Sequence, residues 1–216
     1  MIKIILSIFI IANFLFANLT DFDYTKKDYK ILKDLDIEST FIDDETLQEL
    51  FSQYSKEHRL NDYVSNIKKS AVYIPKIKEE LKKEGLPNSF LFMPMAESDF
   101  KIDATSESKA SGLWQFIPQT AKLFNLRNDE YVDERLDFIK STKAAAKYIY
   151  SNYERFDKWY LAILAYNCGE GRVIEAITRA SIDKYLELFP EKNDSEKISG
   201  YQKIIDRYVE TKRDFN

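Results

Sequence analysis

The chain of 216 residues is 44% hydrophobic and 14% aromatic, which suffices for one large core and a small appendage but not for two large domains. Its 32 basic and 36 acidic residues give a net charge of −4, so nothing in this balance attracts nucleic acid. One cysteine and one histidine exclude an internal disulfide and argue against a zinc or other soft-metal site. We therefore expect one main domain without a metal, a cofactor or a nucleic-acid partner.

Residues 1–17 are predicted to be a secretory signal peptide. Lys3 precedes an apolar stretch over residues 4–15, and Ala17 is a small residue at a suitable cleavage point. An uncleaved membrane anchor is the alternative, but a spanning helix needs roughly 20 apolar residues, and Asn13 interrupts this stretch. We expect export to the periplasm and a mature chain that begins near residue 18, with an inner-membrane anchor if the segment is not cleaved.

The remaining sequence predicts helices and no strands. Residues 18–45 are polar and weakly patterned, which predicts a mobile or loosely docked arm. From Glu45 the apolar spacing is helical, with two helices meeting near Pro75 and Gly85 ending the second of them. Further helical patterns occupy residues 89–97, 118–124, 137–156, 159–167, 171–180 and 198–214. The predicted class is all-α, with about eight helices.

Glu97 is the one acid in the run FLFMPMAE. Phe90, Met93, Pro94 and Glu97 are spaced as one face of a helix, so the glutamate continues an apolar stripe. A carboxyl group that faces a core or a cleft has a raised pKa, which suits a proton donor near neutral pH. A structural ion pair with a lysine or arginine at the edge of the core is the alternative, and position alone favours it at least as much as the proton donor.

Three of the five glycines lie in two short segments, ASGLWQFIP and AYNCGEGRV. Glycine permits a positive φ and a close approach of a ligand to the backbone, so Gly112, Gly169 and Gly171 suggest a binding site. A helix cap is an equal alternative for Gly169. Cys168 is expected to be a small core residue, because free cysteine is among the most buried residue types. A nucleophilic thiol would need a base nearby, and the sole histidine, His58, lies far away in sequence.

Aromatic faces and neutral polar groups accompany these glycines, a mixture suited to sugars and peptides. The residues are Trp114, Gln115, Tyr166 and Asn167. Considered alone, each of these residue types is more often a packing residue than a ligand contact.

Together these segments resemble the catalytic domain of family 1 lytic transglycosylases, and most closely its D-type branch. The motifs are Glu-Ser at 97–98, Gly-Leu-Trp-Gln at 112–115 and Ala-Tyr-Asn at 165–167, with Trp114 in place of the commoner methionine. They stand in the family's order within residues 75–180. The resemblance implies a lysozyme-like, goose-type helical domain over 75–180. An N-terminal arm with helices over 18–70 and a C-terminal helical extension over 181–216 would flank it.

The same resemblance implies one acid/base, a peptidoglycan substrate and a monomeric enzyme. Glu97 would protonate the glycosidic oxygen after a MurNAc residue and then deprotonate the C6 hydroxyl of that sugar, which closes a 1,6-anhydro ring. Tyr166 would orient Glu97, and Ser98 would shape the site beside it. Gln115 and Asn167 would bind N-acetyl and hydroxyl groups, and Trp114 would be a wall of the cleft or the core beneath it.

Two other functions stay open. Ordinary glycoside hydrolases use a second carboxylate within about 5 to 10 Å of the first. The candidates for this second carboxylate are Asp99, Asp103, Glu107 and Glu170, and helical spacing pairs none of them with Glu97. A muramidase that uses water is nevertheless one alternative. A catalytically silent glycan-binding scaffold of the envelope is the other, although a pure binder has no use for a proton donor.

Overall fold

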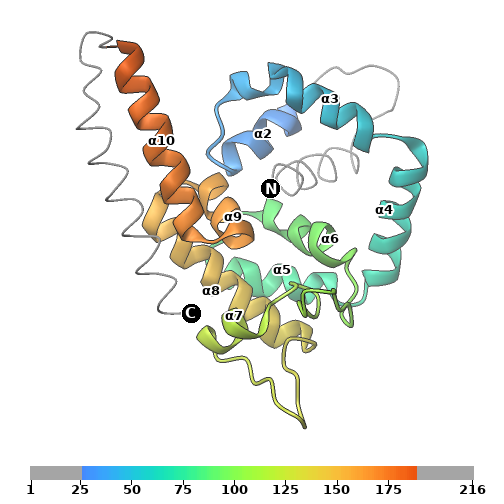
Figure 1. Cartoon of the computed structure of the whole chain (residues 1–216). Helices are drawn as coiled ribbons and strands as arrows, with labels where there is room; N and C mark the ends of the chain where they lie inside the picture. Colours follow the sequence, from blue (N-terminus) through green and yellow to red (C-terminus); the bar gives the residue numbers. More distant parts are fainter. Residues whose placement is uncertain (1–25, 189–216) are drawn as a thin grey trace. The chain divides into compact units, whose positions relative to one another are not determined.

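The computed structural model describes residues 26–188, so the predicted signal peptide and the chain beyond residue 188 lie outside it. Within that range the regular structure is nine α-helices, two 3-10 helices and three isolated β-bridges (Figure 1). The all-α prediction is confirmed. None of the helices between residues 26 and 188 combines the length and apolar character needed to cross a membrane. The chain divides into two compact units between Ile163 and Leu164, which are described separately.

The helices follow one another along the chain with short connections. They are α2 (Lys26–Asp34), η1 (Ser39–Asp43), α3 (Glu45–Tyr54), α4 (Glu57–Ser70), α5 (Ile74–Lys83), η2 (Asn88–Phe92), α6 (Met93–Ser98), α7 (Pro118–Leu123), α8 (Phe138–Phe156), α9 (Trp159–Cys168) and α10 (Glu170–Leu188).

The predicted loose arm is, over its described part, a docked helical segment. Leu32 of α2, Leu35 directly after this helix and Ile42 of η1 are at most 2% exposed. The carbonyl of Leu35 accepts a hydrogen bond from the backbone N–H of Tyr160, 3.1 Å away. The prediction of a mobile or loosely docked arm over 18–45 is therefore wrong from residue 26 onward, where the segment is helical and its apolar residues are buried. Its apolar residues are few, but they lie on one face and are buried together.

The predicted boundaries of α5 are confirmed. Pro75 lies in the first turn of α5, and Gly85 follows its last residues with φ +79°, a conformation that suits glycine. α5 packs against α8 and η2, and its residues Ile77 and Leu81 are buried. This pairing forms the centre of the first unit.

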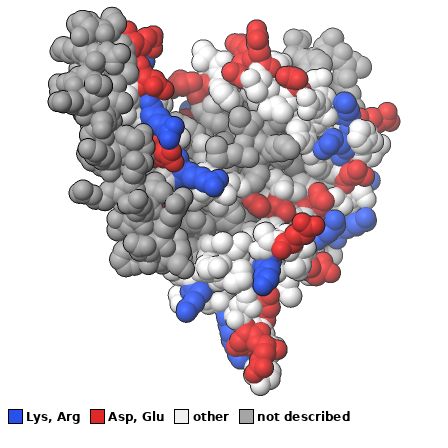
Figure 2. Space-filling model, viewed as in Figure 1, with Lys and Arg blue, Asp and Glu red and all other residues white. Residues whose placement is uncertain are grey.

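A long loop joins α7 to α8, and Figure 2 shows acidic and basic side chains along its described surface. α8 begins where the side chain of Asp137 accepts hydrogen bonds from the backbone N–H groups of Ile139 and Lys140. The ring of Trp159 from α9 stacks on Tyr153 of α8, with ring centroids 3.9 Å apart. These contacts fix both ends of α8 within the first unit.

The second unit contains the end of α9 and all of α10. Gly169, between them, has φ +81°, and its N–H donates to the carbonyl of Ala165 at 2.9 Å. The helix-cap interpretation of Gly169 is therefore correct. Gly171 lies inside α10. Cys168 is half-buried instead of forming part of a core, and burial raises the pKa of its thiol.

Candidate active site

Glu97 lies in the last turn of α6. The apolar stripe that precedes it was predicted as one helix, but the structure divides it into the 3-10 helix η2 and the α-helix α6. Pro94 accounts for the break, because proline fits the first turn of a new helix and cannot donate within a continuing one. Phe90 and Met93 are fully buried, whereas Glu97 at the end of the stripe is half-buried.

One oxygen of the Glu97 carboxyl group has no hydrogen-bond partner among the described residues. This atom, Oε1, is enclosed and accepts no hydrogen bond, and no cation between residues 26 and 188 forms an ion pair with it. Burial raises the pKa of Glu97 to about 7. The predicted alternative of a structural ion pair is therefore wrong. At near-neutral pH a large share of this carboxyl group is protonated and able to donate.

The helix that carries Glu97 ends in an unusual turn. Asp99 and Phe100 both adopt left-handed conformations, with φ 54° and 60°, which is rare for a bulky aromatic residue. The backbone N–H of Phe100 donates to the carbonyl of Pro94 at 3.2 Å, and the carbonyl of Phe100 accepts from the hydroxyl of Tyr73. The surrounding structure thus holds this short helix in one position.

Ser98 connects the first motif to the second. Its hydroxyl donates to the carbonyl of Leu113 at 2.9 Å and shares this proton with the carbonyl of Pro94 at 3.0 Å. The side chain is buried, so its role here is to fix the helix of Glu97 against the turn at residues 111–116. This agrees with a residue that shapes the site.

The backbone around position 112 leaves room only for glycine. Gly112 has φ +78°, and a Cβ atom placed on it would lie 1.9 Å from the carbonyl oxygen of Arg135. The neighbouring segment of the protein fills the space beside this glycine, which explains the residue without a ligand.

Arg135 supports the same turn, and the sequence analysis missed it. Its guanidinium donates to the carbonyls of Lys109 and Phe116, at 2.7 and 2.9 Å. Two further donors pair with the carboxylate of Asp133, at 2.9 and 2.7 Å. Arg135 is only 6% exposed. Local sequence spacing does not predict the contacts of Arg135 with Lys109 and Phe116, because these residues lie 26 and 19 positions before it.

Trp114 belongs to the core beneath the second motif. It is 0% exposed, and its indole N–H donates to the hydroxyl of Thr142 at 2.9 Å. The assignment of Trp114 to substrate binding as a cleft wall is therefore wrong, and the alternative of a core residue is correct. Gln115 is half-buried, and its amide nitrogen donates to the carbonyl of Gly112 at 2.9 Å. Its amide orientation is thus fixed by the turn.

The other acidic candidates of the first unit differ from Glu97. Asp99 is exposed and lies 3.5 Å from the ammonium group of Lys101, and Asp103 and Glu107 are exposed. Tyr166 and Asn167 are half-buried residues of α9 that belong to the second unit, as does Glu170. Their roles beside Glu97 stay predictions. Within residues 26–188 no three metal-ligating side chains gather into a potential metal site.

The sequence model of the transglycosylase SLT domain family matches residues 75–189, more than half of the chain. The chain belongs to the transglycosylase SLT domain family. The match includes the helix of Glu97, the turn at residues 111–116 and α9, so the resemblance drawn from the three motifs is confirmed.

Two relatives illustrate the similarity. A protein from Alteromonas sp. (strain M-1), named for tributyltin chloride resistance, is 45% identical over 107 residues, 49% of this chain and 52% of its own length. Membrane-bound lytic murein transglycosylase D of Escherichia coli (strain K12) is 35% identical over 127 residues, 58% of this chain and 28% of its own length. The chain therefore spans about half of the first relative and little more than a quarter of the second.

Proposed function

We propose that this SLT-family protein is a lytic transglycosylase that cleaves the β-1,4 bond between MurNAc and GlcNAc in peptidoglycan. One observation carries the proposal: Glu97, in the Glu-Ser motif, has one enclosed carboxyl oxygen that accepts no hydrogen bond from the described residues, and burial raises its pKa to about 7. Such a group can hold a proton, release it to a glycosidic oxygen and take one back at the same pH.

In the proposed reaction the proton of Glu97 passes to the glycosidic oxygen, and the bond from this oxygen to C1 of MurNAc breaks. The ionised Glu97 then removes the proton of the C6 hydroxyl of the same sugar. The C6 oxygen bonds to C1 and closes the 1,6-anhydro ring, and Glu97 is protonated again. No water is consumed. An internal nucleophile has a high effective concentration, so a second carboxylate is not needed.

Four polar residues are assigned to the same site. Because the amide nitrogen of Gln115 is bonded to Gly112, its carbonyl oxygen is the group left to accept from an N-acetyl N–H. Ser98 holds the helix of Glu97 in place. Tyr166 orients the carboxyl group of Glu97, and Asn167 binds sugar hydroxyl or N-acetyl groups. Both of these last assignments rest on the Ala-Tyr-Asn motif at 165–167.

We further propose that the protein works in the periplasm as a monomer, after export by the signal peptide of residues 1–17. The sequence of that segment supports this location. N-terminal sequencing of the exported protein tests it. A mature chain beginning near residue 18 is expected, and an intact Met1 in the membrane fraction would mean an uncleaved anchor.

Mass spectrometry of the products released from purified peptidoglycan tests the activity. We expect products that end in 1,6-anhydro-MurNAc, released about 10²- to 10⁴-fold more slowly by Glu97→Gln. Asp99→Asn is the matched control, because it removes an exposed carboxylate two residues away and should leave product release unchanged. Reducing MurNAc ends would indicate the muramidase, and binding without any product would indicate the silent scaffold.

A further inference from the structure

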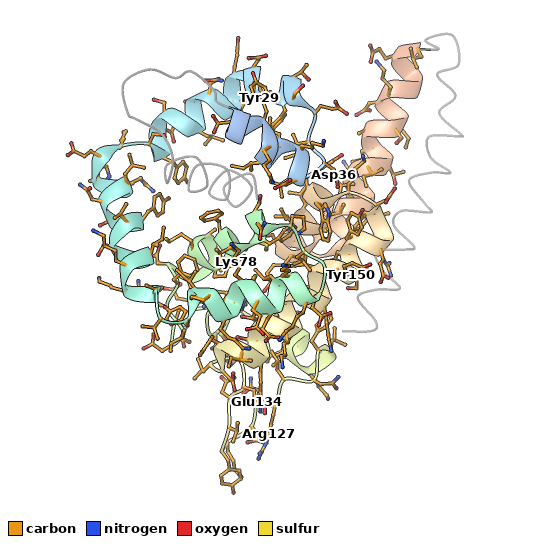
Figure 3. All side chains as sticks on the ribbon, turned by 180° about the vertical axis from the view of Figure 1, so that it is seen from behind. Tyr29, Asp36, Lys78, Arg127, Glu134 and Tyr150 are labelled. Atoms are coloured by element: carbon orange, nitrogen blue, oxygen red, sulfur yellow. The ribbon has the colours of Figure 1, made fainter. Side chains whose placement is uncertain are left out.

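A pocket of about 480 Å³ lies in the first unit, between the N-terminal helix α2 and the C-terminal part of α5. Lys30 and Asp34 line it from α2, Lys78 and Lys82 line it from α5, and the turn at residues 85–88 completes it. None of these residues belongs to the proposed catalytic site. Figure 3 looks onto α5, with Lys78 labelled on it.

The charges of this pocket are unbalanced. Lys30 is neutralised by Asp34, whose carboxylate lies 2.7 Å from its ammonium group. Neither Lys78 nor Lys82 forms an ion pair with any residue of the described range. The two glutamates of α5 do not neutralise them, because Glu79 and Glu80 pair with other lysines.

Lys78 and Lys82 are four residues apart on one helix, so their side chains lie on the same face and their like charges repel. Both reach the same pocket. A ligand with two negative groups would relieve this repulsion and would meet two flexible ammonium donors. The amide of Asn88, at the pocket's edge, adds a further hydrogen-bonding group.

The rest of the lining suits an organic ligand. The turn that lines the pocket contains three residues without polar side chains, Gly85, Leu86 and Pro87. A volume of about 480 Å³ falls in the range of small-molecule sites and far exceeds the needs of a single inorganic ion.

The pocket is not confined to the family domain. The SLT match begins at residue 75, so the wall formed by Lys30 and Asp34 comes from a segment outside the match. The docking of α2 therefore gives this chain a site that the matched domain does not form by itself.

We propose that this pocket binds a short peptide through two of its carboxylates, which would face Lys78 and Lys82. The peptide's body would lie on the turn at residues 85–88. The peptides attached to peptidoglycan strands are the natural source we infer, and this identification of the source rests on the proposed function. The pocket would then hold the substrate at a second point, away from the bond that is cleaved.

A binding titration of the isotopically labelled full chain, followed by NMR, tests the proposal. The probe is the tripeptide Ala-Glu-Lys, with its form in which both carboxylates are amidated as the comparison. We expect the free acid to shift the backbone amide signals of Gly85, Leu86 and Asn88 and the diamide not to do so. The tripeptide contains no glycosidic bond, so the result does not depend on whether the protein cleaves glycan.

Two double variants locate the contact. Lys78→Gln with Lys82→Gln should weaken tripeptide binding at least about fivefold, the size expected for two partly solvated charge contacts. Lys68→Gln with Lys69→Gln removes the same charge from exposed positions of α4 and should leave binding unchanged. Equal weakening in both variants, or none in the first, would overturn the proposal. Inorganic phosphate binding at these lysines as tightly as the tripeptide would overturn the assignment to peptide carboxylates.

Discussion

Glu80 of α5 and Glu97 of α6 are glutamates of the same compact unit. The side chain of Glu80 is buried, and Glu97 is half-buried with one carboxyl oxygen enclosed. Their neighbours differ. The carboxylate oxygens of Glu80 lie 3.1, 3.3 and 3.9 Å from the ammonium groups of Lys83, Lys76 and Lys143. Glu97 has an enclosed oxygen without a single hydrogen-bond donor.

Burial acts on both carboxyl groups in the same direction, because it disfavours the charged form. For Glu80 burial would raise the pKa, but the hydrogen bonds from Lys83 and Lys76 outweigh it and lower the pKa. For Glu97 nothing comparable offsets burial, and the pKa rises to about 7. The presence of cationic partners, and not burial itself, separates an acid that stabilises the fold from one that can transfer a proton.

The largest expected difference is in activity. Glu97→Gln keeps the shape of the side chain but cannot exchange a proton, so the rate of anhydro-muropeptide release should fall by about 10²- to 10⁴-fold. The melting temperature should not fall, because no partner is left unpaired. Rates and melting curves measured on one preparation check both statements. A folded Glu97→Gln protein of wild-type rate would refute the proton-transfer role.

A second variant removes the support of Glu97 and leaves Glu80 untouched. Gly112→Ala would place a methyl group 1.9 Å from the backbone oxygen of Arg135 at a left-handed position. We expect a loss of about 3 kcal/mol or more in the free energy of unfolding, from overpacking and backbone strain together. Urea denaturation measures this loss. A Gly112→Ala protein of wild-type stability would show that the turn relaxes without cost.

The pH dependence of stability should have opposite signs at the two glutamates. The pKa of Glu97 rises from 4.5 to about 7 on folding, so the protein loses stability as pH increases between these values, by about 3 kcal/mol. Glu97→Gln should remove this loss. The lowered pKa of Glu80 stabilises the fold above its unfolded pKa, and this contribution disappears as pH falls through the folded value.

Denaturation of wild type and Glu97→Gln at pH 4.5 and pH 8 measures the contribution of Glu97. The two proteins should be similar at the lower pH, and the variant should be the more stable one at the higher pH. An identical pH dependence in both would contradict the raised pKa.

The smallest effect is expected for Glu80→Gln. Its lysine partners have side chains that are 39% to 54% exposed, so water can solvate them again when the carboxylate is lost. We expect a cost of about 1 to 2 kcal/mol, below that of breaking a fully buried pair. Thermal unfolding with a parallel activity assay checks this. The folded variant should cut glycan at the wild-type rate. A loss of activity larger than the unfolded fraction explains would contradict a purely structural role for Glu80.

The sequence predicts the environment of Glu80 better than that of Glu97. Lys76 and Lys83, four residues before and three after Glu80, are in the positions that pair on one helix. Lys101 stands four residues after Glu97 and would also reach it on a continuing helix. α6 ends at Ser98, however, and Lys101 lies near Asp99 instead. The end of α6 therefore determines whether Lys101 can pair with Glu97, and apolar spacing predicts helix ends poorly.

Local signals identified α5 through Pro75 and Gly85, and the three motifs identified the family. Tertiary contacts were not predictable in this way. The burial of Trp114 depends on the hydroxyl of Thr142, 28 residues later, and the need for Gly112 depends on the backbone at Arg135. Neither contact has a period or a local pattern in the sequence.

The raised pKa of Glu97 can be measured by an NMR titration of the side-chain carboxyl carbons in protein labelled with ¹³C at glutamate. One carboxyl signal should titrate near pH 7 in the wild type and be missing in Glu97→Gln, while it persists in Glu80→Gln. A Glu97 signal that titrates near 4.5, the ordinary value for glutamate, would contradict the claim that burial without a partner keeps this acid protonated near neutral pH.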